Sequence, residues 1–222
     1  TGVTVKHNTA ASAENLQGFD SIVLATGVVP RDVKLPVQAG SKVNVVSYLD
    51  VLKHDAPVGQ RVAVIGAGGI GFDVAEFLTH DHHVDGPLKH AVDPKAVNDF
   101  LQSWNIDADI SVPGGLNVAD KTSSTAAPSR QVYLLQRKAG KLGTSLAKTT
   151  GWIHRSTVRK HGVEELADCK YVEVTDQGLV LDRNGVKSTL EVDTVIICAG
   201  QEPLRDLQAA AAKLVKNVFL IG

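Results

Sequence analysis

The sequence predicts an α/β protein that contains a Rossmann-like domain with a parallel sheet. The first observation is the apolar run RVAVIG, which is followed by a cluster of glycines and then by helix-forming residues up to Leu78. The second is that further apolar runs of strand length alternate with helical segments. The third is that two runs, at 20–31 and 193–205, both pass through a small-residue turn, ATG or CAG, and reach a proline soon afterwards.

Composition and charge are those of a globular protein. The chain has 222 residues, of which 43% are hydrophobic and 21% charged, and its formal net charge is −1. This balance gives no reason to expect binding to nucleic acid or to an anionic membrane, and no apolar run reaches the roughly 18 residues of a membrane span. Cys169 and Cys198 are far apart and match no metal-binding spacing, so we expect reduced thiols and a cytoplasmic location.

Apolar or alternating runs bounded by Gly, Pro, Asn or Asp predict the strands. These runs lie at 1–9, 21–24, 61–66, 131–138, 217–222 and within 193–203. Residues 169–192 predict a small β-meander, because turn residues stand at Asp176-Gln177-Gly178 and at Asn184-Gly185.

Capping residues and apolar spacing predict the helices. Ser47 can cap a short helix, and the glycine cluster opens a second one. A further helix follows Thr150-Gly151 and stops at Gly162. Before it, residues 81–129 interrupt the alternation of strands and helices, and we expect a helix at 94–104 and an irregular loop within this segment.

The glycine cluster matches the pattern G-x-G-x-x-G at Gly66, Gly68 and Gly71, with Gly69 inside it. Because it stands between a strand and a helix, it predicts a dinucleotide site. Gly66 would allow the tight turn, Gly68 would let the backbone approach a pyrophosphate, and Gly71 would let the helix pack on the strand. The helix dipole would then face the phosphates. The alternative is a merely tight strand-to-helix turn.

The acidic residue that holds the ribose hydroxyls of NAD is missing. The second strand ends in Gln136, Arg137 and Lys138 instead, and a guanidinium matches a 2′-phosphate. We therefore predict NADPH as the cofactor, with a solvated basic pair as the alternative. The strand end lies much farther along the chain than the usual distance of about 20 residues, so either 81–129 is an insertion or the strand is misplaced.

Other segments offer further candidates. Lys148, His154 and Arg155 could face the phosphates of the cofactor or lie on a solvated surface, whereas residues 149–151 are better explained as a helix cap and Trp152 as a packing residue.

Two small-Gly turns, Thr26-Gly27 and Ala199-Gly200, place bare backbone at strand ends, where dinucleotide sheets bind ligands. No catalytic residue is predicted. His80, His82 and His83 stand close together, but a polar loop explains them better than a metal site.

Six segments together resemble the bacterial NADPH-dependent 2,4-dienoyl-CoA reductases, which are old-yellow-enzyme-related flavoproteins similar to trimethylamine dehydrogenase. The segments are SYLDVL, APVG, VAVIGAGGIGFDVAEFL, LLQRK, GKLGTSLAKTTGWIHR and VIICAGQEP. The resemblance implies that 1–55 and 199–222 are partial segments of an FAD-binding domain, and that 56–198 is an NADPH-binding domain inserted between them. The two small-Gly turns would then be the crossings between these domains.

The resemblance also implies roles for residues. Gly66, Gly68, Gly69 and Gly71 would hold the pyrophosphate of NADPH. Arg137 and Lys138 would hold its 2′-phosphate, with Gln136 and Arg155 nearby. Ala199 and Gly200 would lie near the nicotinamide, and Thr26 and Gly27 would line the FAD side.

In such a reductase, NADPH passes a hydride to FAD, and electrons reach FMN through a 4Fe-4S cluster to reduce an unsaturated fatty acyl-CoA in β-oxidation. FMN, the cluster and the acyl-CoA site would lie outside this chain, whose two ends look like cuts through a longer protein. The chain would then be an incomplete, inactive portion whose partners are NADPH and the remainder of its own polypeptide. The alternatives are the equivalent domain of a related amine dehydrogenase or demethylase, or a non-catalytic nucleotide-binding module.

Overall fold

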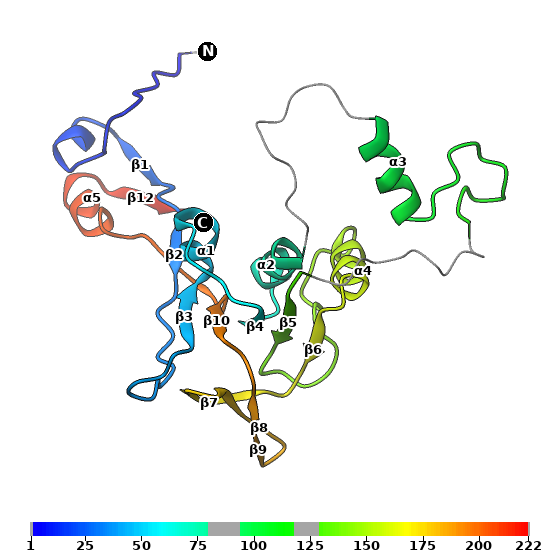
Figure 1. Ribbon diagram of the computed structural model, residues 1–222. Coiled ribbons are helices and arrows are strands. Elements are labelled where there is room, and N and C mark those ends of the chain that lie inside the picture. The colour runs from blue at the N-terminus through cyan, green and yellow to red at the C-terminus, as the bar shows by residue number, and fades with distance from the viewer. Residues whose placement is uncertain (1, 80–93, 118–128, 222) are drawn as a thin grey trace. The chain divides into compact units, whose positions relative to one another are not determined.

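The chain divides into two units in the computed structural model, which describes residues 2–79, 94–117 and 129–221 (Figure 1). The smaller unit combines Thr1–Lys34 with Ala199–Gly222, and the larger unit is Leu35–Cys198. The first division therefore falls after Lys34 and not near residue 55, because residues 44–47 pair within the sheet of the larger unit.

A five-stranded parallel sheet forms the centre of the larger unit, in the order β3, β10, β4, β5, β6 (Figure 1). The strands are Asn44–Ser47 (β3), Thr194–Ile197 (β10), Arg61–Ile65 (β4), Gln131–Leu135 (β5) and Glu164–Leu166 (β6). Every residue of β4 after Arg61 is buried, as a continuous apolar run predicts for a central parallel strand. The predicted α/β fold class with a parallel sheet is confirmed.

Three helices share one apolar core with this sheet. They are α1 (Tyr48–His54), α2 (Gly69–Thr79) and α4 (Gly151–Lys160). Phe72 of α2 and Val158 of α4 are fully buried in the same cluster as Leu134 of β5. Helix α2 packs against both β5 and α4, so the helix that follows the glycine cluster is held on two sides.

The predicted cap of α1 is confirmed. The Ser47 hydroxyl accepts a hydrogen bond from the Asp50 amide at 3.2 Å, and the Asp50 carboxylate accepts one from the Ser47 amide at 2.9 Å. These reciprocal bonds form a capping box. Hydrogen bonds from Ser47 also lower the pKa of Asp50 below its ordinary value.

The predicted meander is confirmed as an antiparallel sheet of β7 (Lys170–Thr175), β8 (Gly178–Arg183) and β9 (Val186–Leu190). Asn184 and Gly185 connect β8 to β9, and both have positive φ, +54° and +81°. A two-residue turn with this backbone matches the twist of the strands it joins, which explains the Asn-Gly pair.

Helix α3 (Pro94–Ser103) forms where its apolar spacing predicted, within the segment that separates α2 from β5. Just after α3, Trp104 lies under the ammonium group of Lys160, 5.2 Å from the ring centroid, and the same group donates to the Ser103 carbonyl. A cation over an indole face is attractive. Lys160 thus links the end of α3 to α4. Because β4 pairs directly with β5, the second strand was placed correctly.

The smaller unit contains two strand pairs. β1 (Ser21–Leu24) pairs in parallel with β12 (Asn217–Leu220), and the turn-following strands β2 (Val28–Pro30) and β11 (Gln201–Pro203) pair antiparallel. A short turn of 3-10 helix, η1 (Glu14–Leu16), and α5 (Gln208–Leu214) complete the unit, and Ala211 of α5 is buried against β1. The similarity between 20–31 and 193–205 therefore reflects two segments that lead into paired strands, β2 and β11.

The expected strand at 1–9 is wrong. The structure has no strand over residues 2–9, and Val3 and Val5 are 76% and 67% exposed. Their alternating pattern fits a strand, but nothing in the described part of the chain pairs with it. The three neighbouring histidines, His80, His82 and His83, lie outside the described residues.

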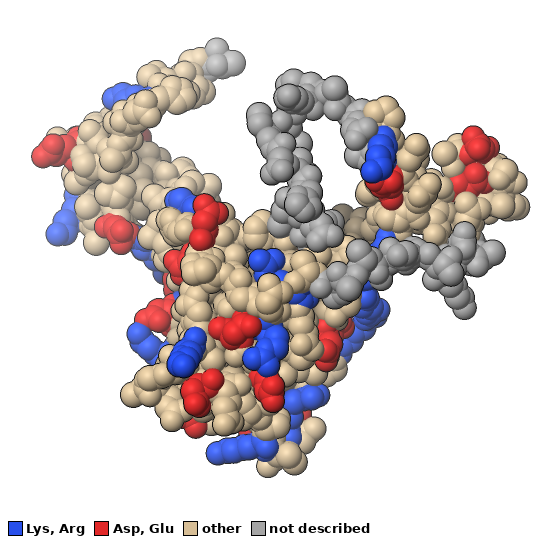
Figure 2. Space-filling view, viewed as in Figure 1, with Lys and Arg blue, Asp and Glu red and all other residues tan. Residues whose placement is uncertain are grey.

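Acidic and basic side chains are interspersed over the face shown in Figure 2, rather than gathered into a field of one sign. This distribution agrees with the formal net charge of −1. Within the described ranges, none of the helices combines the length and apolar character needed to cross a bilayer.

Replacing Ser47 with alanine should lower the free energy of unfolding by about 1 kcal/mol, because α1 loses its capping box. Urea denaturation of the variant and the wild type measures the change. Ser188→Ala, which alters an exposed serine on β9, serves as the control and should leave stability unchanged. Equal stability of both variants would contradict a contribution of the cap.

Candidate nucleotide-binding site

The carboxyl ends of three neighbouring strands lie level with one another. Ile65 of β4 is in register with both Leu135 of β5 and Ile197 of β10. The Gly66 amide donates to the Leu135 carbonyl at 2.9 Å, which holds the start of the glycine turn against the neighbouring strand. The sheet thus brings the predicted residues at 66–71 and 136–138 to one edge, where open α/β sheets bind ligands.

The glycines in the turn have different reasons to lack a side chain. Gly66 has a φ of +116°, a conformation that L-residues rarely adopt. A Cβ on Gly71 would lie 1.7 Å from the Gly66 carbonyl oxygen, so the close approach of α2 to β4 requires glycine there. Both agree with their predicted roles in folding.

Gly68 and Gly69 differ, because a Cβ on either would meet no atom within 4 Å. Both are exposed, Gly69 as the first residue of α2 and Gly68 directly before it. Neither has a positive φ. Nothing in the fold therefore requires glycine at these two positions. The free space over the helix N-terminus is what a phosphate group would need.

The loop after β5 carries the predicted basic pair. Arg137 and Lys138 are exposed, whereas Gln136 is half-buried. The Gln136 side-chain amide donates to the carbonyls of Lys138 at 2.9 Å and Gly140 at 3.1 Å. Burial strongly raises the pKa of Tyr171, the Cys169 thiol adds to this rise, and the positive charge of Arg137 opposes it.

The Arg155 side chain bonds to the backbone of this chain. Its guanidinium donates to the Gly143 carbonyl at 2.9 Å, which ties α4 to the loop that follows the basic pair. Gly143 has a φ of +71°, and a Cβ there would lie 2.8 Å from the Phe72 ring. A Cβ on Gly151 would likewise lie only 2.7 Å from the Cβ of Leu146. This loop is therefore closely packed on α2 and α4, a role that its sequence did not reveal.

The other candidates from the same segment contact α2 or lie at the surface. The His154 ring nitrogen Nδ1 is 3.7 Å from carboxylate oxygens of both Asp73 and Glu76 on α2. Lys148 is exposed. Thr150 occupies the N-cap of α4 but makes no side-chain capping bond, and Trp152 is 55% exposed rather than packed.

The two small-Gly turns belong to the smaller unit. Gly27 and Gly200 have φ values of +78° and +98°. The Thr26 hydroxyl donates to the Leu204 carbonyl at 2.6 Å, which holds the first turn against the segment after β11. The first turn lies inside the smaller unit, and the second stands directly at the division after Cys198. Only the second is a crossing between units.

Gly200 leaves room for Arg31. A Cβ on Gly200 would lie 3.0 Å from an Arg31 guanidinium nitrogen, and this guanidinium is paired with Glu202 at 2.5 Å. The Arg31 amide also donates to the Gly200 carbonyl at 3.1 Å.

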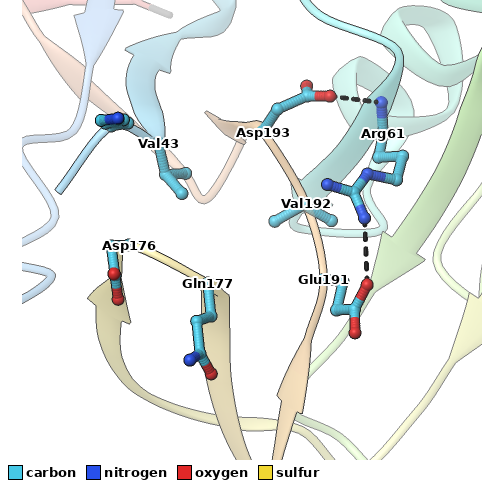
Figure 3. A pocket seen from close by; sticks show the side chains of 8 residues that line it. Val43, Arg61, Asp176, Gln177, Glu191, Val192 and Asp193 are labelled. Atoms are coloured by element: carbon cyan, nitrogen blue, oxygen red, sulfur yellow. Dashed lines mark hydrogen bonds and ion pairs between the residues drawn. The ribbon is translucent and has the colours of Figure 1, made fainter.

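A pocket of about 450 Å³ lies at the opposite end of β4 and β10 (Figure 3). It is lined by Lys42, Val43, Arg61, Asp176, Gln177, Glu191, Val192 and Asp193. Arg61 pairs with Glu191 at 3.0 Å, and the Asp193 carboxylate accepts the amides of Gln60 and Arg61. Arg61, Glu191 and Asp193 are therefore bonded within the protein, at the amino ends of the strands. The glycine turn lies at the carboxyl ends.

Both cysteines are buried and unpaired, so this chain contains no disulfide. Burial raises the pKa of Cys198 to about 12, and burial also raises that of Cys169. In the described parts of the chain, no group of three His, Cys, Asp or Glu side chains could hold a metal ion.

Gly71→Ala and Gly68→Ala should differ widely in their effects on stability. The first forces a Cβ against the Gly66 carbonyl and should cost more than about 2 kcal/mol, whereas the second meets only open space and should change stability by less than about 0.5 kcal/mol. Urea denaturation of each variant provides the measurement. A large loss in Gly68→Ala would mean that the fold itself needs this glycine.

Cys198 should make unfolding easier at alkaline pH. Its folded pKa of about 12 is above the ordinary value of 9.0. As the pH rises from 9.0 to about 12, the unfolded state therefore loses a proton that the folded state keeps. Stability therefore falls by up to about 1.4 kcal/mol per pH unit from this group. We expect the free energy of unfolding of Cys198→Ala to fall less steeply than that of the wild type between pH 9 and 10; parallel slopes would refute this assignment.

The chain is similar over its whole length to curated reductases. A metal reductase of Desulforamulus reducens is 23% identical over 227 residues, which cover 100% of this chain and 31% of the relative. A cinnamate reductase of Clostridium sporogenes is 26% identical over 223 residues, which cover 100% of this chain and 26% of the relative. The chain thus spans less than a third of the length of either relative.

Solved structures share the fold. The match to a 2-naphthoyl-CoA reductase has a TM-score of 0.65 at 19% identity and covers 100% of this chain and 26% of that one. The match to a histamine dehydrogenase of Rhizobium sp. 4-9 has a TM-score of 0.63 at 15% identity and covers 96% and 29%. The family model described as pyridine nucleotide-disulphide oxidoreductase matches residues 2–219, and the chain therefore belongs to that family.

Proposed function

We propose that this chain is the part of a flavin-dependent reductase that binds NADPH and presents its hydride to FAD. Membership of the pyridine nucleotide-disulphide oxidoreductase family supports an oxidoreductase that uses FAD and NAD(P)H. The observation that carries the proposal is the pairing of a bare helix N-terminus with a basic loop. Gly68 and Gly69 leave open space, and Arg137 and Lys138 are exposed at the same edge of the sheet.

Each group has a task that its chemistry fits. Gly66, Gly68, Gly69 and Gly71 would let the backbone amides and the dipole of α2 approach the pyrophosphate. Arg137 and Lys138 would bind the 2′-phosphate, for which a guanidinium offers paired donors. Arg155 would lie near the 2′-phosphate, because its bond to the Gly143 carbonyl leaves other N–H donors of the guanidinium for the cofactor. When bound, NADPH supplies the hydride, so no side chain of this chain is needed as an acid or nucleophile.

The smaller unit is proposed to be part of an FAD-binding domain, with Thr26 and Gly27 on the flavin side and Ala199 and Gly200 near the nicotinamide. The support for this proposal is that one face of its parallel strand pair, β1 and β12, is uncovered. Val23 and Phe219 are register partners, and they are 57% and 55% exposed. Parallel sheets are normally covered on both faces. The remainder of the polypeptide is the proposed cover.

The parent protein is proposed to be an NADPH-dependent 2,4-dienoyl-CoA reductase with FMN and a 4Fe-4S cluster in its other part. The segments LLQRK and GKLGTSLAKTTGWIHR favour this branch over an amine dehydrogenase, because the first supplies the basic pair. The two sequence relatives are both named reductases, which supports a reductive direction, whereas the histamine dehydrogenase shows only a shared fold. Four clustered cysteines in the adjoining sequence of the parent would support the cluster.

Isothermal titration of this chain should give a lower dissociation constant for NADPH than for NADH. Arg137→Ala should weaken NADPH binding by about 1–3 kcal/mol, because a charge-assisted hydrogen bond is lost, and should leave NADH binding nearly unchanged. Lys187→Ala removes an exposed cation from β9 and serves as the matched control. Equal affinities of the wild type for the two nucleotides would remove the argument from Arg137 and Lys138.

A further inference from the structure

We infer that Gln136 is a positioning residue for nucleotide selectivity, which acts on the 2′-phosphate through the loop that carries Arg137 and Lys138. The inference rests on the proposed function of that loop. It assigns Gln136 a different task from direct contact with the cofactor, which its place in the sequence suggested.

The first observation is the geometry of the Gln136 side chain. Its Nε2 donates to the Lys138 carbonyl at 2.9 Å and to the Gly140 carbonyl at 3.1 Å. Both partners are acceptors, so the amide nitrogen and not the oxygen must face them. The two bonds span the loop from its start to Gly140, and Arg137 and Lys138 lie between.

The second observation is that Gln136 is itself anchored to the sheet. Its amide donates to the Leu166 carbonyl of β6 at 3.0 Å, and its carbonyl accepts the Cys169 amide at 3.0 Å. The Lys138 carbonyl accepts a further bond from the Asp168 amide at 3.1 Å. The side-chain amide therefore connects a fixed backbone position to a loop that is exposed on its outer side.

Hydrogen-bond capacity excludes a second role for the same nitrogen. A glutamine amide has two N–H donors, and both are used by the loop carbonyls. The remaining oxygen is an acceptor and would not bind a phosphate oxygen. Gln136 therefore cannot donate to the phosphates of a cofactor while it braces the loop.

Bracing matters because residues 137–140 are all exposed, and the Asp168 amide bonds to them only at the Lys138 carbonyl. Gly140 has a φ of +86°, and a Cβ there would meet no atom within 4 Å. A loop that contains such a glycine samples many conformations when its hydrogen bonds are lost. Holding Arg137 and Lys138 in place before the nucleotide arrives lowers the ordering cost of binding. The benefit applies to the 2′-phosphate, which NADPH has and NADH lacks.

The test compares Gln136→Ala with Gln131→Ala, a matched variant at the other end of β5. Gln131 also uses Nε2 for two bonds, to the Tyr133 hydroxyl at 2.6 Å and to the Glu164 carboxylate at 3.3 Å. Isothermal titration should show about tenfold weaker NADPH binding for Gln136→Ala, the effect of two lost hydrogen bonds. Its NADH affinity should stay within about twofold of the wild type, and Gln131→Ala should change neither affinity.

Two further measurements separate positioning from a general loss of structure. Amide hydrogen exchange at Asp168, whose amide donates to the Lys138 carbonyl, should become faster in Gln136→Ala, while exchange in β4 and α2 stays unchanged. In the double variant Arg137→Ala/Lys138→Ala, adding Gln136→Ala should cause no further loss of NADPH affinity, because the residues through which it acts are gone. If Gln136→Ala does not fold, Gln136→Met keeps the side-chain length and removes only the amide.

The outcomes distinguish this inference from the proposed function. A wild type that binds NADPH and NADH equally would overturn the proposed selectivity. A selective wild type with equal losses for both nucleotides in Gln136→Ala would mean that Gln136 contacts the shared part of the cofactor, which overturns the positioning role. Unchanged affinities in Gln136→Ala, or a further loss in the Arg137→Ala/Lys138→Ala background, would overturn it as well.

Discussion

The close approach of α2 to β4 at Gly66 and Gly71 is the constraint on which the larger unit depends. The space between the Gly66 carbonyl and Gly71 is too small for a Cβ. The helix therefore begins immediately beside the strand end. From there, Phe72 and Leu78 reach the core under the sheet, and α2 contacts β5 and α4. The same contact directs the first turn of α2 toward the level ends of β4, β5 and β10. Packing and placement of the site therefore have one origin.

The four glycines of the motif separate into two classes on this basis. Gly66 and Gly71 are needed by the fold, one for its backbone conformation and one for its lack of volume. Gly68 and Gly69 are not needed by any contact in the described structure, because the space beside them is open. A helix N-terminus with unused amides and a positive dipole end is a site for an anion. Under the proposed function, a ligand explains the bare positions, and the fold explains the crowded ones.

The sequence predicted elements whose cause is local. After Arg61 every residue of β4 is apolar and buried, Ser47 and Asp50 form a capping box, and Asn184-Gly185 has the backbone that its turn requires. Prediction failed where partners decide the outcome. Val3 and Val5 alternate like a strand but have no pairing partner in the described chain, and residues 44–47 join the larger unit through β10, a strand far away in sequence.

The site shows the same division between local and non-local causes. The glycine motif and the basic pair are visible as residue types at set spacings, whereas the bonds of Gln136 and Arg155 to loop carbonyls depend on how the loop folds back. Under the proposed function, the pyrophosphate and the 2′-phosphate are bound by groups of the larger unit, which has its own buried core. Hydride delivery needs a flavin site in the smaller unit, where Val23 and Phe219 leave a parallel strand pair exposed on one face. Under this proposal, binding and transfer place different demands on this chain: the first depends on the loop and glycines it contains, and the second on a cover for the exposed face of β1 and β12.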